Sequence, residues 1–308
     1  MRGHWVRLES AWRELRAHAH YPPAVTELLG EAVAASVLLA ATLKFRGTLT
    51  FQLQGNGTVR LLVAQCTHDF RLRAVARGDA DAFGALPRET GETGEARETD
   101  RRALFRRLAG TDGRITVTVE AEERNLRYQG VVPLSGGSLA ESLEAYFASS
   151  EQLPTRVRLA ADGSWAAGML VQKLPEAGRG AMGTSETWAD EAEEVAETWA
   201  SARAGIGQLR RTELLQANVE DLLTRGFSGH DLRLFRGTRV QYECRCSEGR
   251  VAGLLRALGP EEVRDLLREQ GSVTVTCEFC HRPYRFDPVD VEVLFAPESP
   301  SGGSGAIH

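Results

Sequence analysis

The pattern of apolar and polar residues predicts interleaved helices and strands over residues 1–175. YPPAVTELLGEAVAASVLLAATLKF begins with two prolines and repeats apolar residues at helical spacing, which predicts a buried helix. LTFQLQ alternates apolar and polar residues, turns at 55–57 and resumes as VRLLVAQ, which predicts a hairpin with one buried face. Further strands are predicted at RITVTVEAE, LRYQGVVPL, 155–160 and 168–174. This region is therefore expected to be an α+β domain.

Two shorter helices are expected in the same region. Ser138 and Glu141 have the spacing of a capping box ahead of Leu143 and Tyr146, which predicts an amphipathic helix. The charged, glycine-bearing stretch 87–113 predicts a loop around a short Arg-rich helix.

Residues 176–240 predict a helical linker that cannot fold alone. Apolar side chains recur near one face of an otherwise acidic helix and again farther along the chain: Trp188, Val195, Trp199, Ala202, Ile206, Leu215, Val219, Leu222 and Leu223. Isolated helices of this length are marginal in water, so the segment must pack on a neighbouring domain or stay loose. We expect it to lean beside the domain that follows it.

Residues 241–295 predict a small third domain. Gly259 and Pro260 mark a helix start, Gly271 its end, and SVTVT a strand that leads into Cys277. From residue 241 onward the chain has seven Arg, no Lys and eleven acidic residues, a net charge of −4. The last residues, 296–308, are rich in Gly, Ser and Pro and are expected to form a flexible tail.

Composition, net charge and the length of the apolar runs limit the classes of function that the protein can have. The 308 residues are 42% hydrophobic and 26% charged, as in ordinary globular proteins, and the net charge of −5 gives no reason to expect nucleic acid or an anionic membrane as a partner. The longest apolar run, residues 32–43, is shorter than the roughly 20 residues that span a bilayer. The first residues, MRGHWVRLES, lack the apolar core of a secretory signal. We therefore expect a cytoplasmic protein.

Four of the five cysteines form two tight pairs, CRCS and CEFC. Cys244 and Cys246 are separated by thirty residues from Cys277 and Cys280. Because cysteines in a reducing compartment are more often metal ligands or redox groups than structural disulfides, this spacing predicts one tetrahedral Zn²⁺ site per chain. His281 is expected to lie outside the ligand set, and Cys66 to be a buried small side chain.

Two uses of such a site remain open from the spacing alone. One is a zinc ribbon, in which the metal permanently crosslinks a small domain. The other is a redox switch, because cysteines two or three residues apart can reach the Cα separation of a disulfide, about 4.4 to 6.8 Å. Zinc binding is worth on the order of 10 to 16 kcal/mol, more than the roughly 3 to 10 kcal/mol of a domain this small. Oxidation should then unfold the domain, loosen the linker and expose its apolar side chains.

The chain resembles the heat-shock protein 33 family along nearly its whole length. The resemblance lies in HYPPAV, LLAATLKFRGTLTFQLQGNG, RYQGVVPL, YFASSEQLPTR, AAGMLVQ and the cysteine pattern. It departs at the start, where members usually carry a further stretch before the segment matching RGHWVRL. The resemblance implies a substrate-binding and dimerisation domain, a metastable linker and a zinc redox switch.

The resemblance also implies a function. The reduced, zinc-bound form is inactive, and oxidation pairs Cys244 with Cys246 and Cys277 with Cys280, releases zinc and unfolds the linker. The protein is then a non-enzymatic, ATP-independent holdase that binds unfolding client proteins, as a homodimer when active. Expected client contacts are the apolar linker residues Trp188, Trp199, Leu215, Leu222 and Leu223.

Two alternatives belong to other functional classes. A constitutive zinc ribbon could bind nucleic acid or protein partners, but the acidic, lysine-free third domain disfavours nucleic acid. A dithiol oxidoreductase would place its C-x-x-C at the strand-to-helix turn of a βαβ unit, and no such unit is predicted here.

Overall fold

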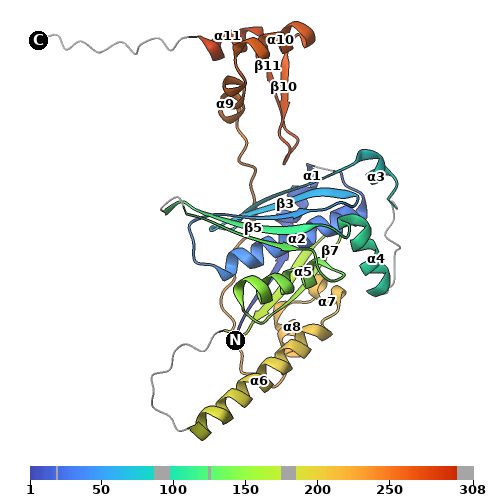
Figure 1. Cartoon of the computed structure of the whole chain (residues 1–308), viewed down its shortest axis with the longest axis vertical. Coiled ribbons are helices and arrows are strands. Elements are labelled where there is room, and N and C mark those ends of the chain that lie inside the picture. The colour runs from blue at the N-terminus through green and yellow to red at the C-terminus, as the bar shows by residue number, and fades with distance from the viewer. Residues whose placement is uncertain (19, 87–97, 124–125, 175–184, 297–308) are drawn as a thin grey trace, which may run out of the picture. The chain divides into compact units, whose positions relative to one another are not determined.

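The computed structural model describes residues 1–18, 20–86, 98–123, 126–174 and 185–296. The chain divides into two compact units, Met1–Glu243 and Cys244–His308 (Figure 1). Both contain helices and strands, so the predicted α+β fold is confirmed. Part of the loop expected at 87–113, and the tail expected at 296–308 apart from its first residue, lie outside the described residues.

A six-stranded sheet lies at the centre of the first unit, in the order β6-β5-β2-β3-β4-β9. Its strands are β2 (Gly47–Gln54), β3 (Val59–Thr67), β4 (Arg71–Gly78), β5 (Arg114–Ala121), β6 (Leu126–Pro133) and β9 (Gln241–Tyr242). β2 and β3 pair in antiparallel register, with Leu53 opposite Leu62, which confirms the predicted hairpin. β9 instead runs parallel to β4 at the edge of the sheet.

Helix α2 (Pro23–Thr42) forms the core of the first unit. Leu29 on the helix and Leu49, Phe51 and Leu53 on β2 are fully buried, as the apolar pattern predicted. By length and composition α2 could also cross a membrane, but 78% of its most apolar window is buried inside the protein. That burial is typical of the core helix of a globular domain.

A second, three-stranded antiparallel sheet covers the other side of α2. Its order is β1-β8-β7, with β1 (Arg2–Leu8), β7 (Thr155–Ala161) and β8 (Ala166–Gln172). α2 contacts strands of both sheets and therefore lies between them. β7 and β8 confirm the strands predicted there, whereas β1 was not predicted.

Shorter helices complete the first unit. They are α1 (Ser10–Ala17), α3 (Ala80–Gly84), α4 (Glu98–Ala109), α5 (Leu139–Tyr146) and the π-helical turn η2 (Phe147–Glu151). The Ser138 hydroxyl accepts a hydrogen bond from the Glu141 amide at 3.2 Å, so the predicted cap of α5 is confirmed. α4 is the predicted Arg-rich helix.

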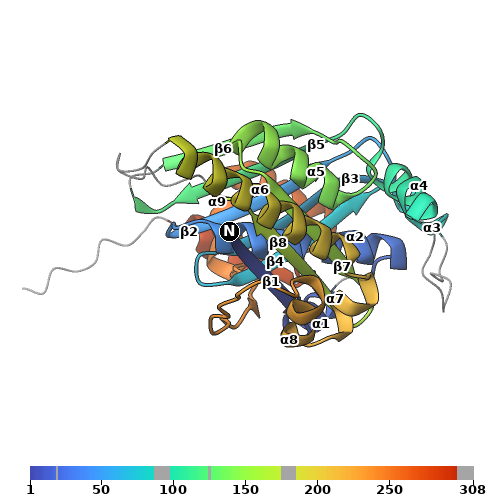
Figure 2. The same ribbon diagram turned by 90° about the horizontal axis from the view of Figure 1, so that it is seen from below.

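Three linker helices cross the face of the second sheet that points away from α2 (Figure 2). They are α6 (Ser185–Gln208), α7 (Arg211–Gln216) and α8 (Val219–Gly226). Their buried side chains form one cluster with β7 and β8, made of Ala160, Ala167, Met169, Val171, Ala202, Ile206, Leu209, Leu214, Leu215, Leu222 and Phe227. Because side chains alternate along a strand, β8 buries one face against α2 and the other against the linker. The linker, which we expected beside the third domain, packs on this sheet.

A charged contact also holds the linker to the first unit. The Arg211 guanidinium at the start of α7 donates to Glu31 at 2.8 Å and to Glu27 at 2.7 Å, both on α2, and to the Ala161 carbonyl. The three charged side chains are largely buried, with exposures of 22%, 15% and 21%. Burial raises the pKa of Glu27, and Arg211 opposes that shift.

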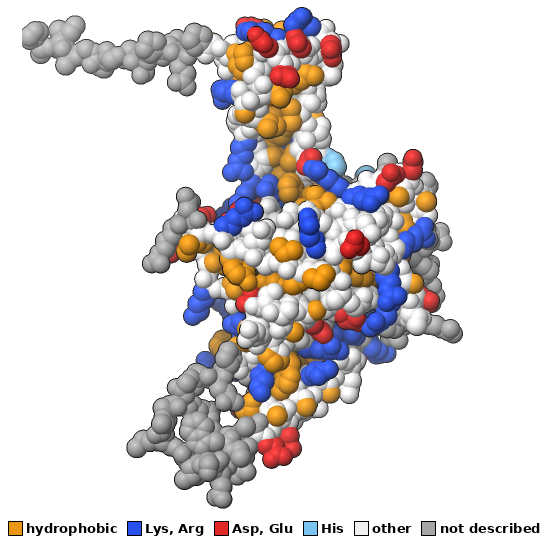
Figure 3. Space-filling view, viewed as in Figure 1, with side chains coloured by type: hydrophobic (Ala, Val, Ile, Leu, Met, Phe, Trp, Pro, Cys, Tyr) orange, Lys and Arg blue, Asp and Glu red, His pale blue; other side chains and the backbone are white. Residues whose placement is uncertain are grey.

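The second unit is small. A hairpin of β10 (Val273–Thr276) and β11 (Pro283–Phe286) packs with α9 (Glu248–Leu258), α10 (Pro260–Gln270) and α11 (Pro288–Phe295). The predicted limits of α10 are confirmed, and Gly271 ends it in the left-handed conformation at φ 73°. Charged side chains, many of them acidic, cover the end of this unit formed by α10 and α11 (Figure 3).

Candidate metal centre

Two short turns carry the paired cysteines. Cys244 and Cys246 lie between β9 and α9, whose first turn is capped by the Ser247 hydroxyl. Cys277 follows β10, and Cys280 lies three residues before β11. The β10–β11 hairpin therefore brings the second pair onto a tight turn, and the chain between the pairs folds as α9 and α10.

The turn that holds the second pair is tightly hydrogen-bonded. The Cys277 amide donates to the Arg282 carbonyl at 2.9 Å, and the His281 amide donates to the Cys277 carbonyl at 2.7 Å. His281 has a positive φ of 53°, which is uncommon for a residue other than glycine. Its side chain is exposed and lies outside the group of clustered ligand atoms, consistent with its predicted exclusion from the ligand set.

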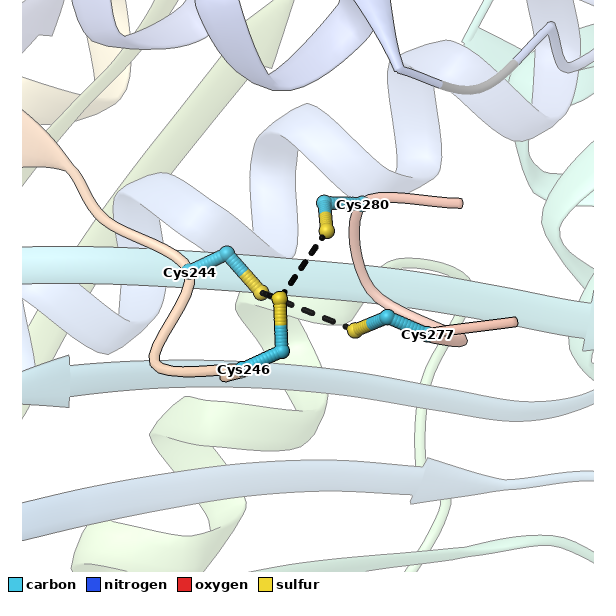
Figure 4. Close-up of side chains that lie close together, drawn as sticks. All are labelled: Cys244, Cys246, Cys277 and Cys280. Atoms are coloured by element: carbon cyan, nitrogen blue, oxygen red, sulfur yellow. Dashed lines mark hydrogen bonds between the residues drawn. The ribbon is translucent and has the colours of Figure 1, made fainter. Parts of the chain in front are cut away.

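The four sulfur atoms converge on one point (Figure 4). The Sγ–Sγ distance is 3.4 Å for Cys244–Cys246, 3.6 Å for Cys244–Cys277 and 3.4 Å for Cys246–Cys280. All four sulfurs lie within 4.8 Å of one another, and all four thiols are free. Zinc–sulfur bonds of about 2.3 Å at tetrahedral angles place sulfurs roughly 3.8 Å apart. The group can therefore hold a metal ion, and its donors suit a thiophilic one such as zinc.

Burial and hydrogen bonds shift the pKa values of three of the four thiols, and not all in the same direction. Burial acts to raise the pKa of Cys246, but hydrogen bonds from the Tyr284 hydroxyl and the neighbouring thiols outweigh it and lower this pKa to about 7. The Tyr284 oxygen lies 3.1 Å from the Cys246 sulfur. Burial raises the pKa of Cys244 and of Cys280, the latter being 8% exposed. Of the three thiols whose pKa is shifted, Cys246 ionises most readily.

The fifth cysteine is separate from this group. Cys66 lies on β3, is fully buried in the first unit, and its thiol faces the Thr67 carbonyl at 3.5 Å. Burial raises its pKa to about 12. A neutral, inaccessible thiol is a poor nucleophile. The prediction that Cys66 is a buried small side chain is confirmed.

The predicted client-contact residues lie in the first unit. Leu215 and Leu222 are buried in the linker cluster, and Trp199 and Leu223 pack against it half-buried. The Trp188 side chain lies outside the described residues. The described members of this set are thus buried or half-buried in this conformation.

Sequence reasoning missed two aromatic residues that lie near the cysteine pairs in the sequence. Tyr284 could have been noticed because PYRF alternates in the hairpin strand, which places Tyr284 and Phe286 on one buried face. Tyr242, on the two-residue strand β9 just before Cys244, stacks on His18 with ring centroids 5.3 Å apart. A strand this short has no periodic signal.

Comparison with known proteins matches the whole chain. The family model described as Hsp33 protein matches residues 1–287. A 33 kDa chaperonin of Nitrosococcus oceani is 38% identical over 97% of this chain and 91% of its own length. Proteins of the same name from Methylobacillus flagellatus and Chromobacterium violaceum are 37% and 38% identical over the full chain and 94% of their lengths.

A solved structure shares the fold. The 33 kDa chaperonin of Thermotoga maritima, a heat shock protein 33 homolog, superposes with a TM-score of 0.73 at 24% identity. The match covers 95% of this chain and 92% of that one.

Proposed function

The chain belongs to the Hsp33 protein family, and on that premise we propose that it is a redox-regulated, ATP-independent holdase chaperone. The reduced chain with Zn²⁺ on Cys244, Cys246, Cys277 and Cys280 is the inactive form. Oxidation forms disulfides Cys244–Cys246 and Cys277–Cys280 and frees the metal. The observation that carries the proposal is one thiol cluster built from two pairs, each close in sequence.

Each disulfide forms in a two-electron oxidation of one cysteine pair. The two thiolates of a pair give up two electrons and join as a disulfide, and one hydrogen peroxide molecule takes up these electrons with two protons from solvent and becomes two water molecules. When bound, the metal supplies four bonds that hold two separate turns together. The cysteine sulfurs cannot keep those bonds as disulfides. Oxidation therefore removes the main crosslink of the second unit, whose apolar cluster is small.

The chain offers a route from the metal centre to the linker. Cys244 directly follows β9, which is held to β4 by backbone bonds from Gln241 to Phe70 at 3.0 Å and from Glu243 to Leu72 at 2.9 Å. Residues 228–240, between α8 and β9, contain neither helix nor strand. Loss of order at Cys244 would fray β9 and free this end of the linker.

Release of the linker would create an apolar surface. Leaving β7 and β8, it would uncover Met169 and Val171, and it would expose its own Ile206, Leu215 and Leu222. Exposed apolar surfaces of this kind bind the apolar segments of unfolding proteins. We propose that clients bind to both surfaces, that no catalytic step is involved, and that the protein works in the cytoplasm as a homodimer.

A combined measurement tests the proposal. The reduced, zinc-loaded protein and the same protein after peroxide at mild heat are compared for bound zinc, free thiols and suppression of aggregation of a heat-unfolding client. We expect zinc release, loss of four free thiols and strong suppression only after oxidation. Tryptophan emission should shift to the red as Trp199 leaves its half-buried site, whereas Trp12, fully buried in the first core, stays covered.

The control variant is Cys66→Ala, which removes a thiol outside the cluster. It should respond to peroxide as the unmodified chain does. If oxidised, zinc-free protein suppressed aggregation no better than reduced protein, the holdase proposal would be wrong. A constitutive zinc ribbon would then be the better description.

A further inference from the structure

Tyr284 is placed beside the metal centre by the register of the hairpin. It lies opposite Val275, two residues before Cys277, and its side chain is 7% exposed. Its hydroxyl donates to the sulfur of Cys246, on the other cysteine pair, at 3.1 Å. Tyr284 therefore connects the strand that follows one pair to a sulfur of the other.

A buried phenol at this position can stabilise negative charge on the metal-binding sulfurs. A divalent metal bound to four thiolates carries a net charge of about −2, and burial of that charge is costly unless donors reach the sulfurs. A thiolate bound to one metal ion retains lone pairs that accept hydrogen bonds. Groups that hydrogen-bond to metal ligands orient them, and their removal typically lowers metal affinity by about 10- to 100-fold.

The surroundings of Tyr284 fix its ring. It packs in the apolar cluster of the second unit with Phe286 and Val263. The Arg282 guanidinium carbon lies 5.5 Å from the ring centroid, within the range of a cation–π contact. With its ring held in this way, the hydroxyl loses little rotational freedom when it donates to sulfur.

We propose that Tyr284 is a positioning residue of the metal centre, whose hydroxyl holds the Cys246 sulfur in ligand geometry and slows metal loss from the first pair. This inference deepens the proposed function, since metal loss is the switching step. It does not depend on chaperone activity, because metal retention can be measured directly.

The test is Tyr284→Phe, which keeps the ring and removes the hydroxyl. In the reduced protein, competition with a chromogenic chelator should show zinc affinity lowered about 10-fold and zinc release correspondingly faster. In the cobalt-loaded protein, the sulfur-to-cobalt charge-transfer bands should move to longer wavelength, because a sulfur without its hydrogen bond gives up an electron more easily. Tyr128→Phe is the matched control, since Tyr128 is a half-exposed tyrosine of the first unit that bonds Glu151.

A rescue variant separates the hydrogen bond from packing. Tyr284→4-aminophenylalanine retains an N–H donor on the same ring and should restore most of the zinc affinity. Unchanged affinity and an unchanged cobalt spectrum in Tyr284→Phe would overturn the inference. So would a loss of affinity that the amine does not rescue, because packing alone would then explain it. If oxidised wild-type protein failed to suppress aggregation, the holdase proposal would fail while these metal measurements still decided the role of Tyr284.

Discussion

The two units of this chain bury apolar surface on very different scales. In the first, α2 lies between two sheets, and one cluster of buried residues extends from β1 to β8. In the second, the buried cluster is limited to a hairpin and three helices, made of Val251, Leu255, Val263, Val273, Tyr284, Phe286, Val291 and Leu294. Because stability from burial grows with the apolar area removed from water, only the first unit has ample means to fold by burial alone.

The difference in buried apolar surface predicts that the two units respond differently to loss of a metal ion. A domain that depends on a metal for its fold can be switched by removing the metal, whereas a domain with a large core persists through the same treatment. The linker packs on the large unit and is joined in sequence to the small one. Its order can therefore depend on both units.

Metal removal should have the largest effect. Chelation of the reduced protein should remove on the order of 10 to 16 kcal/mol of zinc-binding free energy and unfold the second unit. Amide hydrogen exchange would then show rapid exchange throughout α9, α10 and α11 and continued protection of α2. Protected amides in α10 after complete metal removal would contradict the contrast between the units.

Loss of the charged contact of the linker should have an intermediate effect. Arg211→Ala leaves Glu27 and Glu31 largely buried without their closest cation, and breaking a buried pair costs about 3 to 5 kcal/mol, nearer 3 here because the groups retain some exposure. We expect Trp199 fluorescence to report linker release at lower temperature, without oxidant.

The adjacent Arg210 provides the matched control. It is 61% exposed and pairs with Glu213, so Arg210→Ala should cost less than about 1 kcal/mol. Equal effects of the two substitutions would show that the contact with α2 does not hold the linker.

At neutral pH the smallest effect is that of the isolated thiol of the large unit, which acts on stability only at alkaline pH. Because burial raises the pKa of Cys66 to about 12, the unfolded chain ionises this thiol before the folded chain does. The contribution of Cys66 to the free energy of unfolding is therefore constant below about pH 9. It falls by about 1.4 kcal/mol per pH unit between pH 9 and 12. Urea unfolding of the first unit at alkaline pH should show a shallower fall in Cys66→Ala, and an identical slope would mean that Cys66 is not kept neutral by burial.

Local patterns were enough to predict α2, the β2–β3 hairpin and α5. In each case the residues that form the pattern are also those that are buried, and the ends are set by nearby residues such as Ser138. The cysteine spacing likewise identified the four thiols that the structure brings together.

Features set by distant contacts could not be predicted in this way. β9 is only two residues long and exists because β4 offers a free edge and His18 stacks on Tyr242. β8 is buried on both faces, so its sequence does not reveal that the linker covers one of them. The contact between Tyr284 and Cys246 requires a register that joins two turns far apart in the chain.

The near-equal distances within the thiol cluster have a consequence for how the chain would choose disulfide partners. Cys246 lies 3.4 Å from Cys244 and also 3.4 Å from Cys280, so proximity in the folded cluster favours neither. Four cysteines allow three pairings, and once the fold is lost only distance along the chain discriminates among them. Loop-closure entropy then strongly favours neighbours two or three residues apart. The pairing that we propose would thus be encoded in the primary structure and would survive unfolding, so the thiols could be oxidised and reduced repeatedly without a template.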